Sequence, residues 1–82
     1  MDTMKVLVVD ACEEARSSVA AALMELSNVS ILGAVPDVRG AMRALAEGPD
    51  VVVTDCDLPD GDCLDVIEAA RAGLRPPAIV VF

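Results

Sequence analysis

An apolar run that ends in a cluster of carboxylates constrains this chain more than any other feature. Residues 51–61 read Val-Val-Val-Thr-Asp-Cys-Asp-Leu-Pro-Asp-Gly. A short, continuous β-branched run is typical of a strand buried in a parallel sheet, so residues 51–54 are predicted to be one. In open α/β sheets the ligand crevice lies outside the carboxyl ends of the strands. This stretch alone therefore fits two roles for Asp55: a reactive acid, or a strand end with ordinary turn residues at Asp57 and Asp60.

A second apolar run that ends in an acid comes earlier. Residues 5–9, Lys-Val-Leu-Val-Val, are too short for helical periodicity and are followed by Asp10. Behind them, an amphipathic helix is predicted from about Cys12 to Leu26, with Arg16 among the residues that face away. Its apolar stripe consists of Ala15, Val19, Ala22, Leu23 and Leu26. Asp10 and Glu13 also fit a capping box, so the alternative role of Asp10 is to cap this helix.

The middle of the chain repeats this order. Residues 29–35 are predicted to form a strand that Pro36 stops. Asp37 is placed to cap a second helix, which Gly48 and Pro49 end. The apolar stripe of that helix consists of Val38, Ala41, Met42 and Leu45.

A third helix is predicted after the acidic turn, with Asp62 as its N-cap. Its apolar stripe consists of Cys63, Val66, Ile67 and Ala70. Gly73 followed by Leu74 predicts a Schellman ending, in which Leu74 folds back on the last turn. Residues 78–82, behind two prolines, are predicted to be the fourth strand.

The alternation of four strands with three helices predicts an α/β fold of parallel strands joined by right-handed crossovers. The flavodoxin-like strand order 2-1-3-4 of a doubly wound sheet, here incomplete, puts the first and third strands side by side. Asp10 and Asp55 are then adjacent at the switch point. Close carboxylates repel each other, and a shared divalent cation such as Mg2+ explains the pair most economically.

Length and charge exclude several classes of function. The chain of 82 residues is at most one domain, with a thin core. The net charge of −8 argues against direct nucleic-acid binding by this segment, because phosphate contacts need clusters of lysine and arginine. The first residues lack a signal-peptide core, and no apolar run is long enough for a membrane span. A cytoplasmic location, away from the membrane, is therefore expected.

Three cysteines, Cys12, Cys56 and Cys63, are present without CxxC spacing and without any histidine. This argues against a zinc site or a disulfide framework, and free thiols are expected. Cys12 and Cys56 each lie just beyond a predicted strand tip, which leaves a redox or soft-metal role open.

Two motifs together carry a family resemblance. Val6-Leu-Val-Val-Asp10 and residues 51–61 resemble the receiver domain of two-component response regulators, and Ile31-Leu-Gly-Ala-Val-Pro-Asp37 resembles the NarL/FixJ type. The resemblance implies a single partial receiver domain over residues 1–82, about the first two thirds of a receiver. It also implies a sensor histidine kinase as partner, an output in transcription, and a signalling module rather than an enzyme.

The resemblance also assigns the site. Asp55 matches the phosphoacceptor, Asp10 the first of the acidic pair, and Asp57 the residue whose backbone carbonyl completes the Mg2+ shell. Ala11 stands where the second acid is expected, and Phe82 where a switch serine or threonine is expected. Binding of Mg2+ is therefore expected to be weak or absent.

Two other functions stay open on the sequence. Ala11 and Phe82 favour a pseudo-receiver that acts as a phosphorylation-independent interaction module. The pair Asp55 and Asp57 also fits the nucleophile and acid of a haloacid-dehalogenase-like phosphatase, although Pro59 and the short chain argue against it.

Residues 78–82 are apolar on both faces and have no predicted strand beyond them. An exposed apolar edge strand is a template for pairing with another chain. We therefore expect a dimer, formed by edge pairing or helix exchange, or cover from a C-terminal remainder of the protein.

Overall fold

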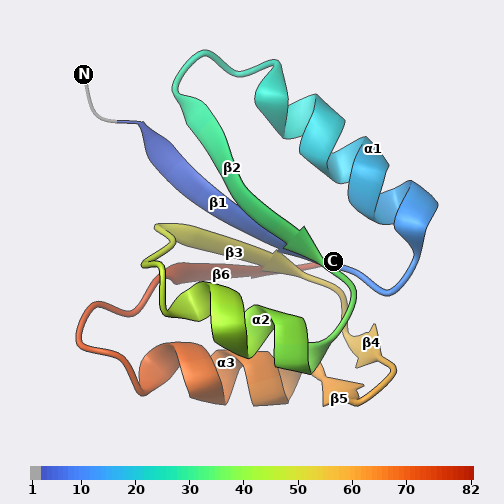
Figure 1. Cartoon of the computed structure of the whole chain (residues 1–82), viewed down its shortest axis with the longest axis vertical. Coiled ribbons are helices and arrows are strands. Elements are labelled where there is room, and N and C mark those ends of the chain that lie inside the picture. The colour runs from blue at the N-terminus through green and yellow to red at the C-terminus, as the bar shows by residue number, and fades with distance from the viewer. Residues whose placement is uncertain (1–2) are drawn as a thin grey trace.

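The computed structural model describes residues 3–82, in which one four-stranded parallel sheet is flanked by helices (Figure 1). The elements in chain order are β1 Met4–Val9, α1 Glu13–Met24, β2 Val29–Val35, α2 Val38–Leu45, β3 Val51–Thr54, β4 Asp57–Leu58, β5 Gly61–Asp62, α3 Cys63–Arg71 and β6 Ala78–Val81. The strand order is β2-β1-β3-β6, and all three pairings are parallel. The predicted flavodoxin-like order 2-1-3-4 is confirmed. No helix of residues 3–82 has the length and apolar character needed to cross a bilayer.

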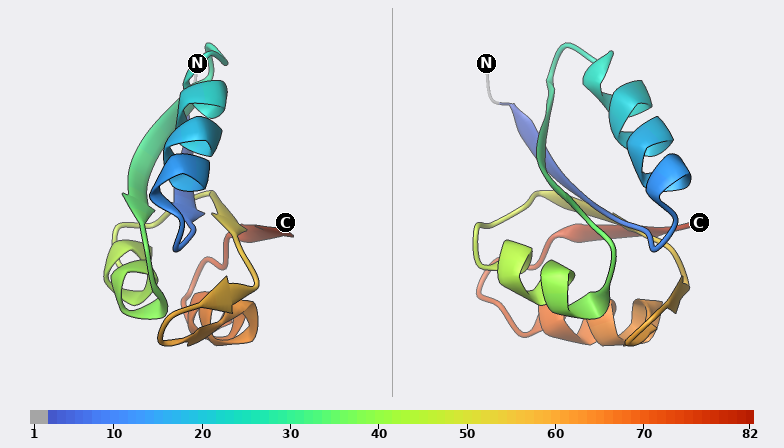
Figure 2. Two further views of the ribbon diagram at one scale, coloured as in Figure 1. Left: turned by 90° about the vertical axis from the view of Figure 1, so that its right-hand side faces the viewer. Right: turned by 45° about the vertical axis from the view of Figure 1, so that its right-hand side comes forward.

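The core lies between the sheet and the face that α2 and α3 cover. Figures 1 and 2 show these two helices together on one side of the strands and α1 alone on the other. The main cluster of buried apolar residues comes from the central strands, the two helices and β4: Leu7, Val9, Val38, Ala41, Ala44, Val52, Leu58 and Val66. The runs of β1 and β3 are central strands, as predicted. Residues 6–9 of β1 are buried on both faces, as is typical of such runs, whereas in β3 Val52 and Thr54 are buried and Val51 and Val53 only half-buried.

The helix α1 is less buried than its sequence predicts. It begins at Glu13 and ends at Met24, and none of its residues is fully buried. Ala15, Val19 and Leu23 are half-buried, but Ala22 and Leu26 of the predicted stripe are exposed. The stripe is wrong at these two positions because α1 packs mainly against β1 and β2, without a second helix beside it to close over its flanks.

The caps of the other two helices are confirmed. Asp37 accepts a hydrogen bond from the backbone N–H of Gly40 at 2.7 Å and begins α2. Asp62 begins α3 with a capping box, in which the Asp65 carboxylate accepts from the Asp62 N–H at 3.0 Å.

The predicted stripe of α2 is wrong at one position. Met42 is 57% exposed, whereas Ala44 is buried with Val38 and Ala41. These buried residues follow i, i+3, i+6 spacing, which turns the small Ala44 toward the sheet and Met42 outward.

The end of α3 differs from the prediction. The C-cap Ala72 is right-handed helical, and Leu74 is fully exposed rather than folded back. A Schellman ending needs a left-handed residue at the position of Gly73. Among the described glycines only Gly48 has a positive φ, at 74°, so the chain makes its left-handed turn after α2 instead.

The acidic loop contains a small hairpin where the sequence predicts only a turn. The strands β4 and β5 pair antiparallel, Asp57 with Asp62 and Leu58 with Gly61. Leu58 is buried and joins the core, which anchors the loop to the sheet.

Candidate functional site: the acidic edge of the sheet

The carboxyl ends of three strands meet at one edge. Val9 pairs with Thr54, and Thr54 pairs with Val81, so the next residues along the chain lie side by side. The backbone ladder continues there, because the N–H of Asp55 donates to the Val9 carbonyl at 2.9 Å and that of Phe82 to the Thr54 carbonyl at 3.1 Å. The structure thus brings Asp10, Asp55 and Phe82 together at adjacent strand ends.

Asp10 is the buried acid of this edge, with 3% of its surface exposed. Its Oδ1 accepts a hydrogen bond from the backbone N–H of Cys12 at 2.9 Å. Asp10 does not cap α1, however, because the N-cap is Cys12, and no side chain caps that end. The capping box is therefore wrong: Glu13 is the first helical residue, not the third.

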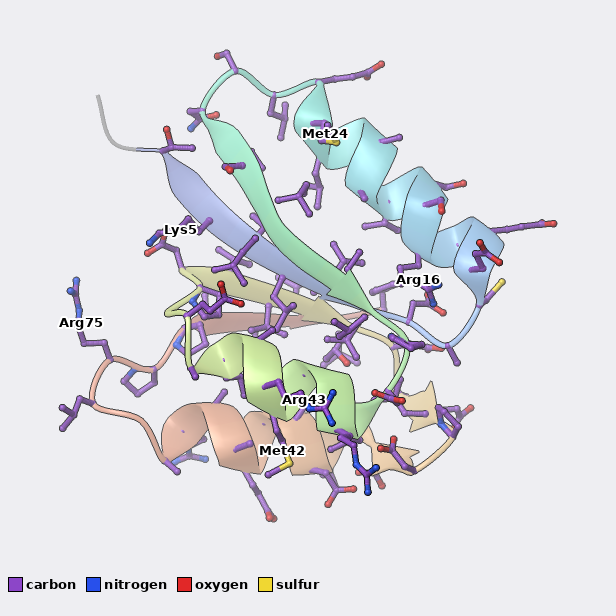
Figure 3. All side chains as sticks on the ribbon, in the orientation of Figure 1. Lys5, Arg16, Met24, Met42, Arg43 and Arg75 are labelled. Carbon is purple, nitrogen blue, oxygen red and sulfur yellow. The ribbon has the colours of Figure 1, made fainter. Side chains whose placement is uncertain are left out.

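Arg16 lies at this edge too, contrary to the prediction that it faces away. Its Nη1 donates to the backbone carbonyl of Asp10 at 2.8 Å, and the side chain is half-buried. In Figure 3 Arg16 lies beside the carboxyl end of β1, whereas Lys5 lies at the other end of that strand. Arg16 therefore brings a positive charge to the acidic edge. The apolar periodicity could not reveal it, because the residue sits on the flank of the stripe.

Asp55 is half-buried at the end of β3. Its Oδ1 accepts from the backbone N–H of Cys56 at 2.8 Å, and its carbonyl accepts from the Thr54 hydroxyl at 3.0 Å. Thr54 is fully buried, so the residue before the acid is fixed. Among the described residues, Oδ2 of Asp55 accepts no hydrogen bond.

The two later acids of the loop have different surroundings. Asp57 is exposed in β4, directly after the Asp55-Cys56 pair. Asp60 contacts the start of α2, where it accepts hydrogen bonds from the backbone N–H groups of Val38 at 2.8 Å and Arg39 at 3.0 Å. The hydrogen bond from Val38, together with that from Arg39, lowers the pKa of Asp60. Asp60 is thus a structural residue that holds the hairpin to α2.

The charged donors for a cation at this edge are few. Within residues 3–82 no group of three or more acids, cysteines or histidines is close enough to hold a metal ion. Ala11, exposed beside Asp10, supplies no side-chain ligand. Mg2+ is usually bound through one or two carboxylates with waters and phosphate oxygens. Asp10 and Asp55 together supply two carboxylates, which fits that pattern without a third acid.

Two cysteines face each other across the base of the hairpin. The Sγ atoms of Cys56 and Cys63 are 3.3 Å apart, and the backbone N–H of Cys63 donates to the Cys56 carbonyl at 3.0 Å. The thiol contact with Cys63 raises the pKa of the Cys56 thiol. All three cysteines are free, as predicted, and Cys12 is exposed at the start of α1.

Comparisons with known proteins give relatives of one kind. No protein-family profile matches the chain. The chain is 34% identical over 84 residues to protein-glutamate methylesterase/protein-glutamine glutaminase 1 of Caulobacter vibrioides, a match that covers 99% of this chain and 24% of that protein.

Solved receiver structures match almost the whole chain. The signal receiver domain of the putative response regulator NarL from Mycobacterium tuberculosis has a TM-score of 0.90 and 27% identity, over 99% of this chain and 66% of that one. The response regulator domain of Thermotoga maritima CheB has a TM-score of 0.88 and 20% identity, over 96% and 59%. The isolated receiver domain of RcsB from Salmonella enterica serovar Typhimurium, in the presence of the phosphomimetic BeF3−, has a TM-score of 0.85 and 20% identity. That match covers 98% of this chain and 61% of that one.

The parallel sheet of order β2-β1-β3-β6 and these likenesses define a flavodoxin-like receiver fold. Response regulator receiver domains of two-component systems are the class of protein that this chain resembles in fold and in sequence. It spans about a quarter of the length of the curated relative and about three fifths to two thirds of the receiver structures described above.

Proposed function

We propose that this receiver accepts a phosphoryl group on Asp55 from a sensor histidine kinase, and that residues 1–82 act as one signalling domain. The observation that best supports this proposal is the hydrogen bond from the Asp55 N–H to the Val9 carbonyl, which places Asp55 beside the buried Asp10. A carboxylate on a fixed strand end is a positioned nucleophile.

The chemistry follows from the atoms at this edge. A carboxylate oxygen of Asp55 attacks the phosphorus of a phosphohistidine, the P–N bond breaks as the P–O bond forms, and the imidazole leaves as the neutral base after protonation. Asp10, Asp55 and the backbone carbonyl of Asp57 would hold Mg2+, which neutralises phosphoryl oxygens when bound. Arg16 adds a positive charge next to Asp10, where the transferred group brings negative charge.

Two residues favour a second candidate, an interaction module that works without phosphorylation. Ala11 offers no oxygen to a cation, and Phe82, 49% exposed at the end of the sheet, has no hydroxyl for a phosphoryl oxygen. The output is proposed to be transcription, by resemblance to the NarL type. The matched proteins are receivers and a methylesterase, which favours the receiver function over the phosphatase interpretation.

Incubation with Mg2+ and acetyl phosphate, followed by intact mass measurement, separates these functions. A labile phosphoryl adduct supports the receiver function. Steady release of phosphate without an adduct indicates a phosphatase. If neither an adduct nor released phosphate is detected, the result supports the interaction module. Omission of Mg2+ is the matched control, because adduct formation through a cation-dependent site stops without it.

A further inference from the structure

The hairpin register places Cys56 and Cys63 directly opposite each other. Asp57 pairs with Asp62 and Leu58 with Gly61, so the next opposing positions are 56 and 63. The N–H of Cys63 donates to the Cys56 carbonyl at 3.0 Å, which extends the pairing to them. Directly opposite residues of antiparallel strands have Cα atoms roughly 4.5–5.5 Å apart, within the range of about 4.4–6.8 Å that a disulfide spans.

The two thiol side chains also lie close to each other. Both thiols turn to the same side of the hairpin, and their Sγ atoms lie 3.3 Å apart. A disulfide bond is about 2.05 Å long, so closing it requires rotation of the side chains over little more than an ångström. Cys56 is exposed and Cys63 half-buried, so a small oxidant reaches the pair from solvent.

We propose that Cys56 and Cys63 form a reversible disulfide, a redox modification site on the loop that follows Asp55. The site takes a low-molecular-weight disulfide, such as oxidised glutathione, as its oxidant. One cysteine thiolate attacks a sulfur of the small disulfide, forms a mixed disulfide and releases one small thiolate. The second cysteine thiolate attacks the protein sulfur of the mixed disulfide, closes the Cys56–Cys63 bond and releases the other small thiolate. The protein loses two electrons and two protons, and the small disulfide gains them as two thiols.

This site is independent of the proposed phosphoryl transfer, because it needs neither a cation nor the carboxylate of Asp55. It is also specific to one of the three possible pairs. Cys12 lies at the start of α1 and makes no thiol contact among residues 3–82, whereas Cys56 and Cys63 directly flank the paired strands β4 and β5.

The test equilibrates the full chain in buffers of reduced and oxidised glutathione, with and without urea. Free thiols are then trapped by alkylation, and the products are read by intact mass and peptide mapping. We expect a product about 2 Da lighter than the reduced chain before alkylation, with label on Cys12 alone. Because folding holds the thiols together, the equilibrium constant for forming this bond is expected to be at least about tenfold higher without urea than with it.

Variants assign the bond. Cys12→Ser retains it, whereas Cys56→Ser and Cys63→Ser give only mixed glutathione disulfides. The proposal is overturned if the native chain carries glutathione adducts without the internal bond, if Cys12 takes part in the bond, or if urea leaves the equilibrium constant unchanged. The comparison with and without urea uses the chain without substitutions. It therefore tests the proposal even if one of the variants folds poorly.

Discussion

Asp60 Oδ1 lies 2.8 Å from the backbone nitrogen of Val38, which ties the loop after Asp55 to the first turn of α2. The first N–H groups of a helix have no partner within it, and a carboxylate there also interacts favourably with the helix dipole. Asp37 satisfies the N–H of Gly40, and Asp60 satisfies those of Val38 and Arg39. The start of α2 is therefore capped partly by the acidic loop.

Replacing Asp60 tests this tie through pH. The folded-state pKa of Asp60 lies below its ordinary value of 3.8, so its contribution to stability is complete above that value and is lost as the pH falls through the folded pKa. Asp60→Asn is expected to lower the urea midpoint at pH 7, and the difference from the parent is expected to shrink below about pH 4. Asp57→Asn, at an exposed position without these hydrogen bonds, is the matched control. A deficit that stays constant with pH would contradict this role.

Asp55 is expected to be the phosphorylated residue if any is. Asp55→Asn removes the carboxylate that is fixed at the strand end, so the adduct formed with acetyl phosphate should disappear in intact mass spectra. Asp57→Asn should retain an adduct, because only the backbone carbonyl of that residue is assigned a role. An adduct that survives Asp55→Asn, or that maps to Asp57 or Asp60, refutes the assignment.

Cation binding is expected to improve when the missing acid is supplied. Ala11→Asp adds a charged oxygen beside Asp10, and Mg2+ prefers such ligands, so the dissociation constant should fall several-fold. Calorimetric titration measures it, and Ala11→Asn separates the effect of charge from that of an added oxygen. Equal affinity in the parent and Ala11→Asp would mean that the position does not face the cation.

The edge strand β6 is expected to drive self-association. Val80, Val81 and Phe82 are 48%, 44% and 49% exposed, and among the described strands β6 pairs with β3 alone. An exposed apolar edge readily pairs with another strand. Sedimentation at micromolar concentration should detect a dimer, and Val80→Lys should shift it toward the monomer. A compact monomer that unfolds cooperatively would refute this expectation.

Core substitutions should reveal the uneven packing of the two faces. Leu7 is completely buried, so Leu7→Ala is expected to cost about 2–5 kcal/mol of unfolding free energy. Leu23, only half-buried on α1, is the matched position, and Leu23→Ala should cost clearly less. Urea denaturation of both variants measures the difference, and equal losses would show that α1 packs as tightly as the core.

The features that sequence could predict are those with a local cause. The central strands follow from β-branched runs, and the helix caps at Asp37 and Asp62 follow from side chains that bond to their own first turn. Adjacency of Asp10 and Asp55 follows from strand order. The bonds of Asp60 to α2 span 21 and 22 residues, and a local pattern cannot encode them.

Other features of the structure could not be predicted from the sequence, for similar reasons. The two-residue strands of the hairpin are too short to show a period. The contact of Arg16 with the carbonyl of Asp10 joins a helix to the end of a strand, which the apolar periodicity of the helix does not describe. The exposure of Met42 and Leu74 depends on what neighbouring elements leave uncovered, which only the assembled fold defines.

The light packing of α1 has a kinetic consequence. Regions with few buried apolar contacts open locally at a lower free-energy cost than the core, so the amides of α1 should exchange with solvent deuterium before those of β1 and β3. Opening the first turn also separates Arg16 from the carbonyl of Asp10 and lets water reach a carboxylate that is otherwise buried. The rate at which this helix frays is therefore expected to limit how quickly solvent reaches the Asp10 carboxylate, whereas Asp55 and Asp57 are already accessible.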